Sequence, residues 1–137
     1  MTPLFADTYY FLALLGVQDP AHPKALALSR QVKQEGRLLI TTAWVLTELG
    51  DALAASVDRH LFARTVVAIK CDPRFVIIPA TEALFNAGLG FYESRSDKEW
   101  GFTDCTSFVV MQEHGITEAL TGDHHFEQAG FKALLKE

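Results

Sequence analysis

Short apolar runs alternate with longer amphipathic stretches along the chain. Four brief runs rich in Val, Ile, Leu or Phe predict strands at Leu4–Ala6, Leu38–Thr41, Phe75–Ile78 and Ala119–Thr121. The stretches between them predict helices of about Thr8–Gly16, Lys24–Gln34, Ala43–Ser56, Arg59–Lys70, Thr81–Glu93 and Thr103–His114. This alternation predicts an α/β fold, a three-layer α/β/α sandwich whose mostly parallel central sheet is covered by helices on both faces.

The rest of the chain adds no second unit to this pattern. A last apolar piece, Phe131–Leu135, fits either an edge strand or a short helix, and the polar stretch Ser94–Gly101 predicts an internal loop. The 137 residues, of which 49% are hydrophobic, suffice for one domain with a real core. We therefore expect a single domain over residues 1–137.

The charge of the chain restricts the classes of function. The formal net charge of −5 argues against a passive module that holds nucleic acid by overall attraction. It leaves open an enzyme that meets a polyanion locally through a metal ion. The two cysteines, Cys71 and Cys105, form no CxxC pair, and no basic segment precedes the first apolar stretch. We expect a reduced, cytoplasmic protein without a membrane segment.

Three aspartates occupy junctions between strands and helices. Asp7 and Asp123 follow the first and last of the four predicted strands, and Asp104 opens a helix. Each has an ordinary structural interpretation: Asp7 as a helix cap, Asp104 as a first-turn acid and Asp123 as a turn residue. If Thr103 is the cap of its helix, Asp104 is free to point elsewhere.

Glu48 is harder to explain by local structure. On a helical period it lies beside Val45 and Ala52 at the border of an apolar stripe, so we expect it to be half inside a core face. An acid there needs a partner, and a salt bridge at the edge of the stripe is one alternative. His124 and His125 invite a metal interpretation, but adjacent histidines usually point in different directions and no HExxH motif is present. Both remain surface or substrate-side candidates.

Together the four acids predict a metal site. In an open parallel sheet, sites form beyond the carboxyl ends of the strands, where carboxylates from several segments converge. Their mutual repulsion would be severe without a divalent cation. Oxygen ligands without cysteine or spaced histidines suit Mg²⁺ or Mn²⁺.

Four motifs carry a resemblance to a known family. "FADTYYFLALL" around Asp7, "TELGDAL" around Glu48, "TDCTSFVVM" around Asp104 and "LTGDHHFEQAGF" around Asp123 occur in this order over nearly the whole chain. In these motifs the sequence resembles the PIN-domain family, most closely the VapC-type ribonuclease toxins of bacterial toxin–antitoxin pairs.

The resemblance implies a metal-dependent endoribonuclease that cuts RNA, is often a homodimer and is often silenced by a small antitoxin protein. The four acids carry over as catalytic, metal-binding residues for Mg²⁺ or Mn²⁺. Thr8 carries over as a hydroxyl contact beside the metal, and Asp97 is an extra acid near the third motif. Arg95 and Lys98 are candidates for steering the RNA backbone, or simply charges of an exposed loop.

Two other classes of protein compete with this interpretation. A phosphotransfer domain also places Asp at strand ends, but the haloacid-dehalogenase type needs Asp-x-Asp where this chain has Tyr9, and a receiver needs an acceptor Asp where it has Pro79. The other alternative is a PIN-like domain that binds metal and a partner protein or RNA without catalysis. The presence of all four acids indicates that the chain can bind metal, but not that it uses the metal for catalysis.

Overall fold

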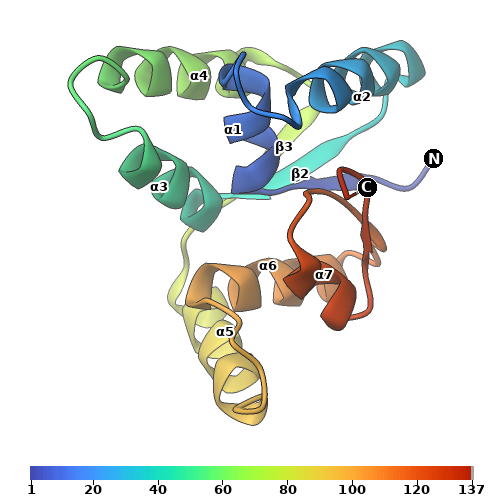
Figure 1. The fold of residues 1–137 in the computed structure, drawn as a ribbon. Helices are drawn as coiled ribbons and strands as arrows, with labels where there is room; N and C mark the ends of the chain where they lie inside the picture. Colours follow the sequence, from blue (N-terminus) through green and yellow to red (C-terminus); the bar gives the residue numbers. More distant parts are fainter. Residues whose placement is uncertain (137) are drawn as a thin grey trace.

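The computed structural model describes residues 1–136, and its centre is a fully parallel five-stranded sheet in the order β3-β2-β1-β4-β5 (Figure 1). The strands are β1 (Leu4–Ala6), β2 (Leu39–Thr42), β3 (Phe75–Ile78), β4 (Glu118–Leu120) and β5 (Lys132–Ala133). All three residues of β1 are buried, as expected for the central strand of a sheet that is covered on both faces.

Helices cover both faces of the sheet. They are α1 (Thr8–Leu15), α2 (His22–Glu35), α3 (Ala43–Ala52), α4 (Arg59–Cys71), α5 (Glu82–Ser94), α6 (Phe102–Glu113) and α7 (His124–Gln128). Figure 1 shows α1, α2 and α4 on one side of the sheet and α5, α6 and α7 on the other, while α3 contacts both α1 and α6. Within residues 1–136, none of the helices combines the length and apolar character needed to cross a membrane.

Local chemistry explains where several helices begin and end. The hydroxyl of Thr42 accepts a hydrogen bond from the Val45 N–H at 3.0 Å, and that of Thr81 accepts one from the Leu84 N–H at 3.1 Å, so both threonines cap a helix start. Helix α2 ends at Gly36, whose φ of 62° lies in the left-handed region that glycine adopts without strain.

The predicted α/β/α architecture is confirmed, with local differences. Helix α3 ends at Ala52 rather than Ser56, because the chain turns through an exposed segment before α4 begins at Arg59. The segment after Phe131 pairs with β4 as an edge strand. The short helix α7 was not predicted from the sequence. Both cysteines are free thiols.

Phe108 lies at the centre of the layer beneath the sheet. Its side chain is fully buried, and its ring packs against those of Phe91, Trp100, Phe126 and Phe131 at centroid distances of 4.9–6.0 Å. These neighbours come from α5, from the loop before α6, and from α7 and the turn that follows it. One aromatic cluster therefore fixes α6 relative to the last third of the chain.

We expect Phe108→Ala to lower the free energy of unfolding by about 3–5 kcal/mol, because it leaves a cavity inside this aromatic cluster. Urea denaturation measures the change. Val67→Ala is the matched control, because Val67 is 61% exposed and its truncation leaves no cavity. Equal effects of the two substitutions would contradict the central role of Phe108.

Candidate metal centre

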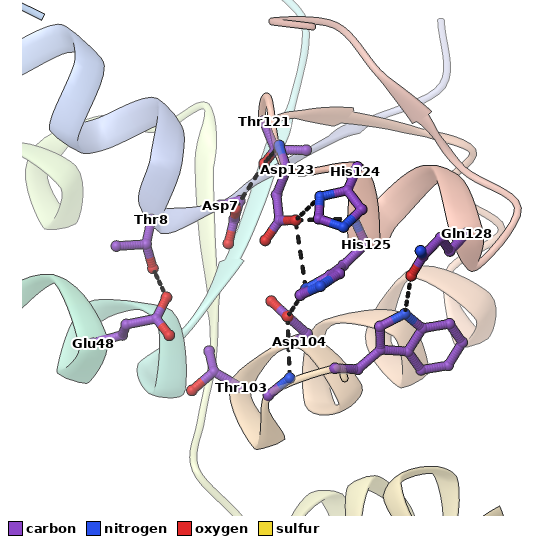
Figure 2. A network of polar contacts seen from close by, with 12 residues as sticks. Asp7, Thr8, Glu48, Thr103, Asp104, Thr121, Asp123, His124, His125 and Gln128 are labelled. Atoms are coloured by element: carbon purple, nitrogen blue, oxygen red, sulfur yellow. Dashed lines mark hydrogen bonds and ion pairs between the residues drawn. The ribbon is translucent and has the colours of Figure 1, made fainter. Parts of the chain in front are cut away.

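The four acids of the motifs meet at the carboxyl edge of the sheet. Strand β1 pairs with β2 on one side and with β4 on the other, so the chain order reverses around β1. Asp7 directly follows β1, Asp123 follows β4, Asp104 lies in the first turn of α6, and Glu48 lies on α3. Figure 2 shows the carboxylates of Asp7, Asp104 and Asp123 turned toward a common space, with Glu48 facing it from the side.

Asp7 is the buried member of the cluster. Its exposed fraction is 4%, and it occupies the N-cap position of α1 as expected, but its side chain makes no capping hydrogen bond there. Instead, its Oδ2 accepts a hydrogen bond of 2.8 Å from the hydroxyl of Thr121. The same hydroxyl accepts the backbone N–H of Asp123 at 3.1 Å and thus joins two of the acids.

The position of Asp7 raises the pKa of its carboxyl group to about 7. Burial is the largest cause, and the charges of Asp104 and Glu48 add to it, while the hydrogen bond from Thr121 acts in the opposite direction. The residues are close enough to repel one another, although they belong to separate elements. A bound cation would remove this cost.

Glu48 lies at the open side of the cluster. The expectation that it is half inside a core face was wrong, because the residue is exposed and the apolar side of α3 consists of Val45, Leu46 and Leu49. Its Oε1 nevertheless accepts a hydrogen bond from the hydroxyl of Thr8. The structure therefore places Thr8 where it orients Glu48 toward the other acids.

Asp104 is held by two contacts to one oxygen. Its Oδ2 accepts the backbone N–H of Gly101 at 3.3 Å and lies 3.1 Å from Nδ1 of His125. Gly101 is the N-cap residue, so Thr103 does not cap this helix. Burial raises the pKa of Asp104, and the charge of Asp123 raises it further. The interpretation of Asp104 as an acid in the first turn of its helix was thus right, but it accounts only for Oδ2.

Asp123 and the two histidines form the third part of the site. Oδ1 of Asp123 accepts the backbone N–H of His125 at 2.9 Å and lies 3.5 Å and 3.7 Å from Nδ1 of His125 and His124. The expectation that the adjacent histidines point apart was wrong, because their ring centroids lie 4.4 Å apart beside the same carboxylate. His125 stands between Asp104 and Asp123 (Figure 2).

The residues fit a hard divalent cation. In each carboxylate, one oxygen is fixed by a hydrogen bond from Thr8, Thr121 or a backbone N–H, and the other is left for a ligand. Oxygen donors held in this way suit Mg²⁺ or Mn²⁺. Asp123, His124 and His125 also offer ligand atoms within 4.8 Å of one another.

Asp97 does not join the four acids. Its carboxylate accepts two hydrogen bonds from Arg95, at 3.0 and 3.1 Å, and this pairing lowers its pKa. The guanidinium of Arg95 also lies 5.0 Å from the ring centroid of Trp100. Arg95 is thus engaged within its own loop, whereas Lys98 lies 3.9 Å from Asp97 and lines the space beside α7.

Sequence reasoning missed the roles of Thr121 and His125. The pairing of the strands could have pointed to Thr121. Ala6 pairs with Leu120 in parallel register, so the next residues, Asp7 and Thr121, lie side by side at the ends of their strands. No comparable signal marks His125, whose contact with Asp104 depends on the position of α7.

The fully parallel sheet with acids gathered at its switch point is an α/β fold that comparisons with known proteins also find in PIN-type proteins. No protein-family model matches the sequence. The sequence is 28% identical over 134 residues to the 23S rRNA-specific endonuclease VapC20 of Mycobacterium tuberculosis, covering 98% of this chain and 99% of that protein.

Solved structures give the same result. The crystal structure of M. tuberculosis VapC20, described as a Sarcin-Ricin loop cleaving toxin, superposes with a TM-score of 0.79 at 26% identity and covers 93% of this chain and 95% of that one. FitAcB from Neisseria gonorrhoeae shares the fold, with a TM-score of 0.64 at 18% identity over 95% and 94% of the two chains. The chain therefore has the fold of VapC20 and is similar to that protein over nearly its whole length.

The raised pKa of Asp7 predicts a pH-dependent stability in EDTA. The folded chain keeps the proton of Asp7 up to about pH 7, while the unfolded chain loses it near pH 4, so the free energy of unfolding falls as the pH rises between these values. The loss from Asp7 is at most about 4 kcal/mol. Urea denaturation between pH 4 and pH 8 measures it.

Asp7→Asn is the matched variant for this experiment, because it keeps the shape of the side chain and cannot ionise. We expect a shallower fall in stability with pH than in the parent protein, with the remaining slope due to Asp104, whose pKa is also raised. The same pH slope in both proteins would contradict the assignment to Asp7.

Proposed function

We propose that this protein is a metal-dependent endoribonuclease that hydrolyses RNA phosphodiester bonds as the toxin of a toxin–antitoxin pair. The observation that carries the proposal is the convergence of Asp7, Glu48, Asp104 and Asp123, each with one oxygen fixed and one free. The match to a named ribosomal RNA endonuclease over nearly the full length of both chains supports it.

The proposed cofactor is Mg²⁺ or Mn²⁺, held by the free oxygens of the four acids. When bound there, a divalent ion would supply charge neutralisation at the phosphate and would activate water for attack. The residues of the chain do the rest: Thr8 orients Glu48, Thr121 fixes Asp7 and the backbone N–H of Gly101 fixes Asp104. One of the carboxylates accepts the proton of the attacking water.

The proposed substrate is a folded RNA, and the first candidate is the sarcin–ricin hairpin of 23S rRNA, because VapC20 is described as cleaving that loop. We also propose a cytoplasmic location, a homodimer and a small antitoxin partner. These proposals rest on the type of protein alone. Co-purification of the protein with the product of a short neighbouring gene would support an antitoxin partner. If the protein purifies alone after co-expression with that product, the result would count against an antitoxin.

Cleavage of a mixed RNA pool and of a sarcin–ricin hairpin by the purified protein tests the activity. We expect cleavage with Mg²⁺ or Mn²⁺, none in EDTA, and a loss of more than roughly 100-fold in Asp7→Asn, since even residues that only support metal ligands are worth 10- to 100-fold. Gel analysis of end-labelled RNA measures the rates.

Asp51→Asn provides the matched control, because Asp51 is an exposed acid on α3 outside the cluster. It makes the same chemical change, and we expect it to keep parental activity. An equal loss in both variants would point to general damage. Metal binding by calorimetry without cleavage of either RNA would favour a binding protein over an enzyme.

A further inference from the structure

A polar pocket opens directly beside the acids. Its volume is about 270 Å³, and it lies between the loop that precedes α6 and helix α7. It is lined by Asp97, Lys98, Glu99, His124, His125 and Gln128. His125 is one of these lining residues, and Nδ1 of its ring lies 3.1 Å from Oδ2 of Asp104. The pocket is therefore one side chain away from the proposed reaction centre.

The orientation of the Gln128 amide in this pocket is fixed. The indole N–H of Trp100, a residue that is 5% exposed, donates to Oε1 of Gln128 at 3.0 Å. An indole nitrogen can only donate, so its partner must be the carbonyl oxygen of the amide. The NH₂ group of Gln128 is thus left to donate to another molecule.

Acceptor groups line the same pocket. Glu99 is exposed, and its carboxylate makes no hydrogen bond or ion pair in the part of the chain that the structure describes. Asp97 is engaged by Arg95 and is not equally available. The side chain of His124 is 61% exposed and offers a ring face for stacking. The pocket combines a fixed donor, a free acceptor and an aromatic face.

We infer that this pocket binds a nucleobase of the RNA that presents a carbonyl beside an N–H, which is guanine or uracil, next to the phosphate that is cut. The amide of Gln128 donates to the carbonyl, Glu99 accepts the N–H, and His124 stacks on the ring. Adenine and cytosine present an amino group and an unprotonated nitrogen at these positions and pair poorly. The inference rests on the proposed function.

The pocket holds one cation that could meet the RNA backbone. Lys98 lines it beside the acids Asp97 and Glu99, and its ammonium lies 3.9 Å from Oδ2 of Asp97, whose carboxylate is also bound by Arg95. A single flexible ammonium suits the phosphate that follows a bound base. Base recognition is thus assigned to Gln128, His124 and Glu99, and backbone attraction to Lys98.

Gln128→Glu is the most informative substitution. It keeps an oxygen for the indole N–H of Trp100, so the local packing is preserved, but it replaces the amide donor by a second acceptor. In a hairpin pool whose positions around the cut are randomised, we expect the parent to favour guanine or uracil over adenine and cytosine by roughly tenfold at one position. The variant should lose or reverse this preference.

Two further variants separate recognition from general charge effects. Gln112→Glu makes the same change on an exposed position of α6 and should keep the parental preference. Trp100→Phe removes the indole N–H that orients the amide, and we expect a weaker preference without reversal. Sequencing of the cleaved ends gives the preference at every position. A preference unchanged by Gln128→Glu would overturn the inference.

A binding experiment on the metal-free protein tests the pocket without cleavage. GMP, UMP, AMP and CMP are each titrated into the ¹⁵N-labelled chain in EDTA, and the side-chain amide of Gln128 is followed by NMR. We expect at least one of GMP and UMP to shift this signal more than either AMP or CMP does. Equal shifts by all four nucleotides, or none, would overturn the inference whatever the outcome of the cleavage assay.

Discussion

The site depends on the burial of one carboxylate, that of Asp7, beside three other acids. Asp7 lies at the end of the central strand with almost no exposed surface, and its neighbours at the site are other acids. Within residues 1–136, no Lys or Arg forms an ion pair with any of the four. Neutral donors, namely threonine hydroxyls and backbone N–H groups, hold them instead, so the negative charge is retained for a cation.

The elements that the sequence predicts are those whose pattern is local. Two strands, Leu4–Ala6 and Phe75–Ile78, have the predicted bounds, because each is a short apolar run ended by a polar residue or proline. The three aspartates could be found for the same reason, since each occupies a recognisable junction, whereas Glu48 was noticed as an acid at the border of an apolar stripe. Their convergence needed only the rule that parallel strands end at one edge of a sheet.

The features that escaped prediction depend on contacts between distant segments. The hydroxyl of Thr121 meets Asp7 across a separation of 114 positions. His125 reaches Asp104 only because α7, too short for a helical period, turns it inward. Glu48 was misjudged because periodicity gives the direction of a side chain around a helix, but not where the neighbouring layer stops.

The order of the segments in the chain has a consequence for synthesis. The central strand β1 comes first, yet its neighbour β4 and the acid that follows it come after more than a hundred further residues. A chain emerging from the ribosome therefore carries Asp7 long before it can be joined by Asp123. The cluster of acids can form only when nearly the whole domain is outside the ribosome, so it is assembled at the end of synthesis.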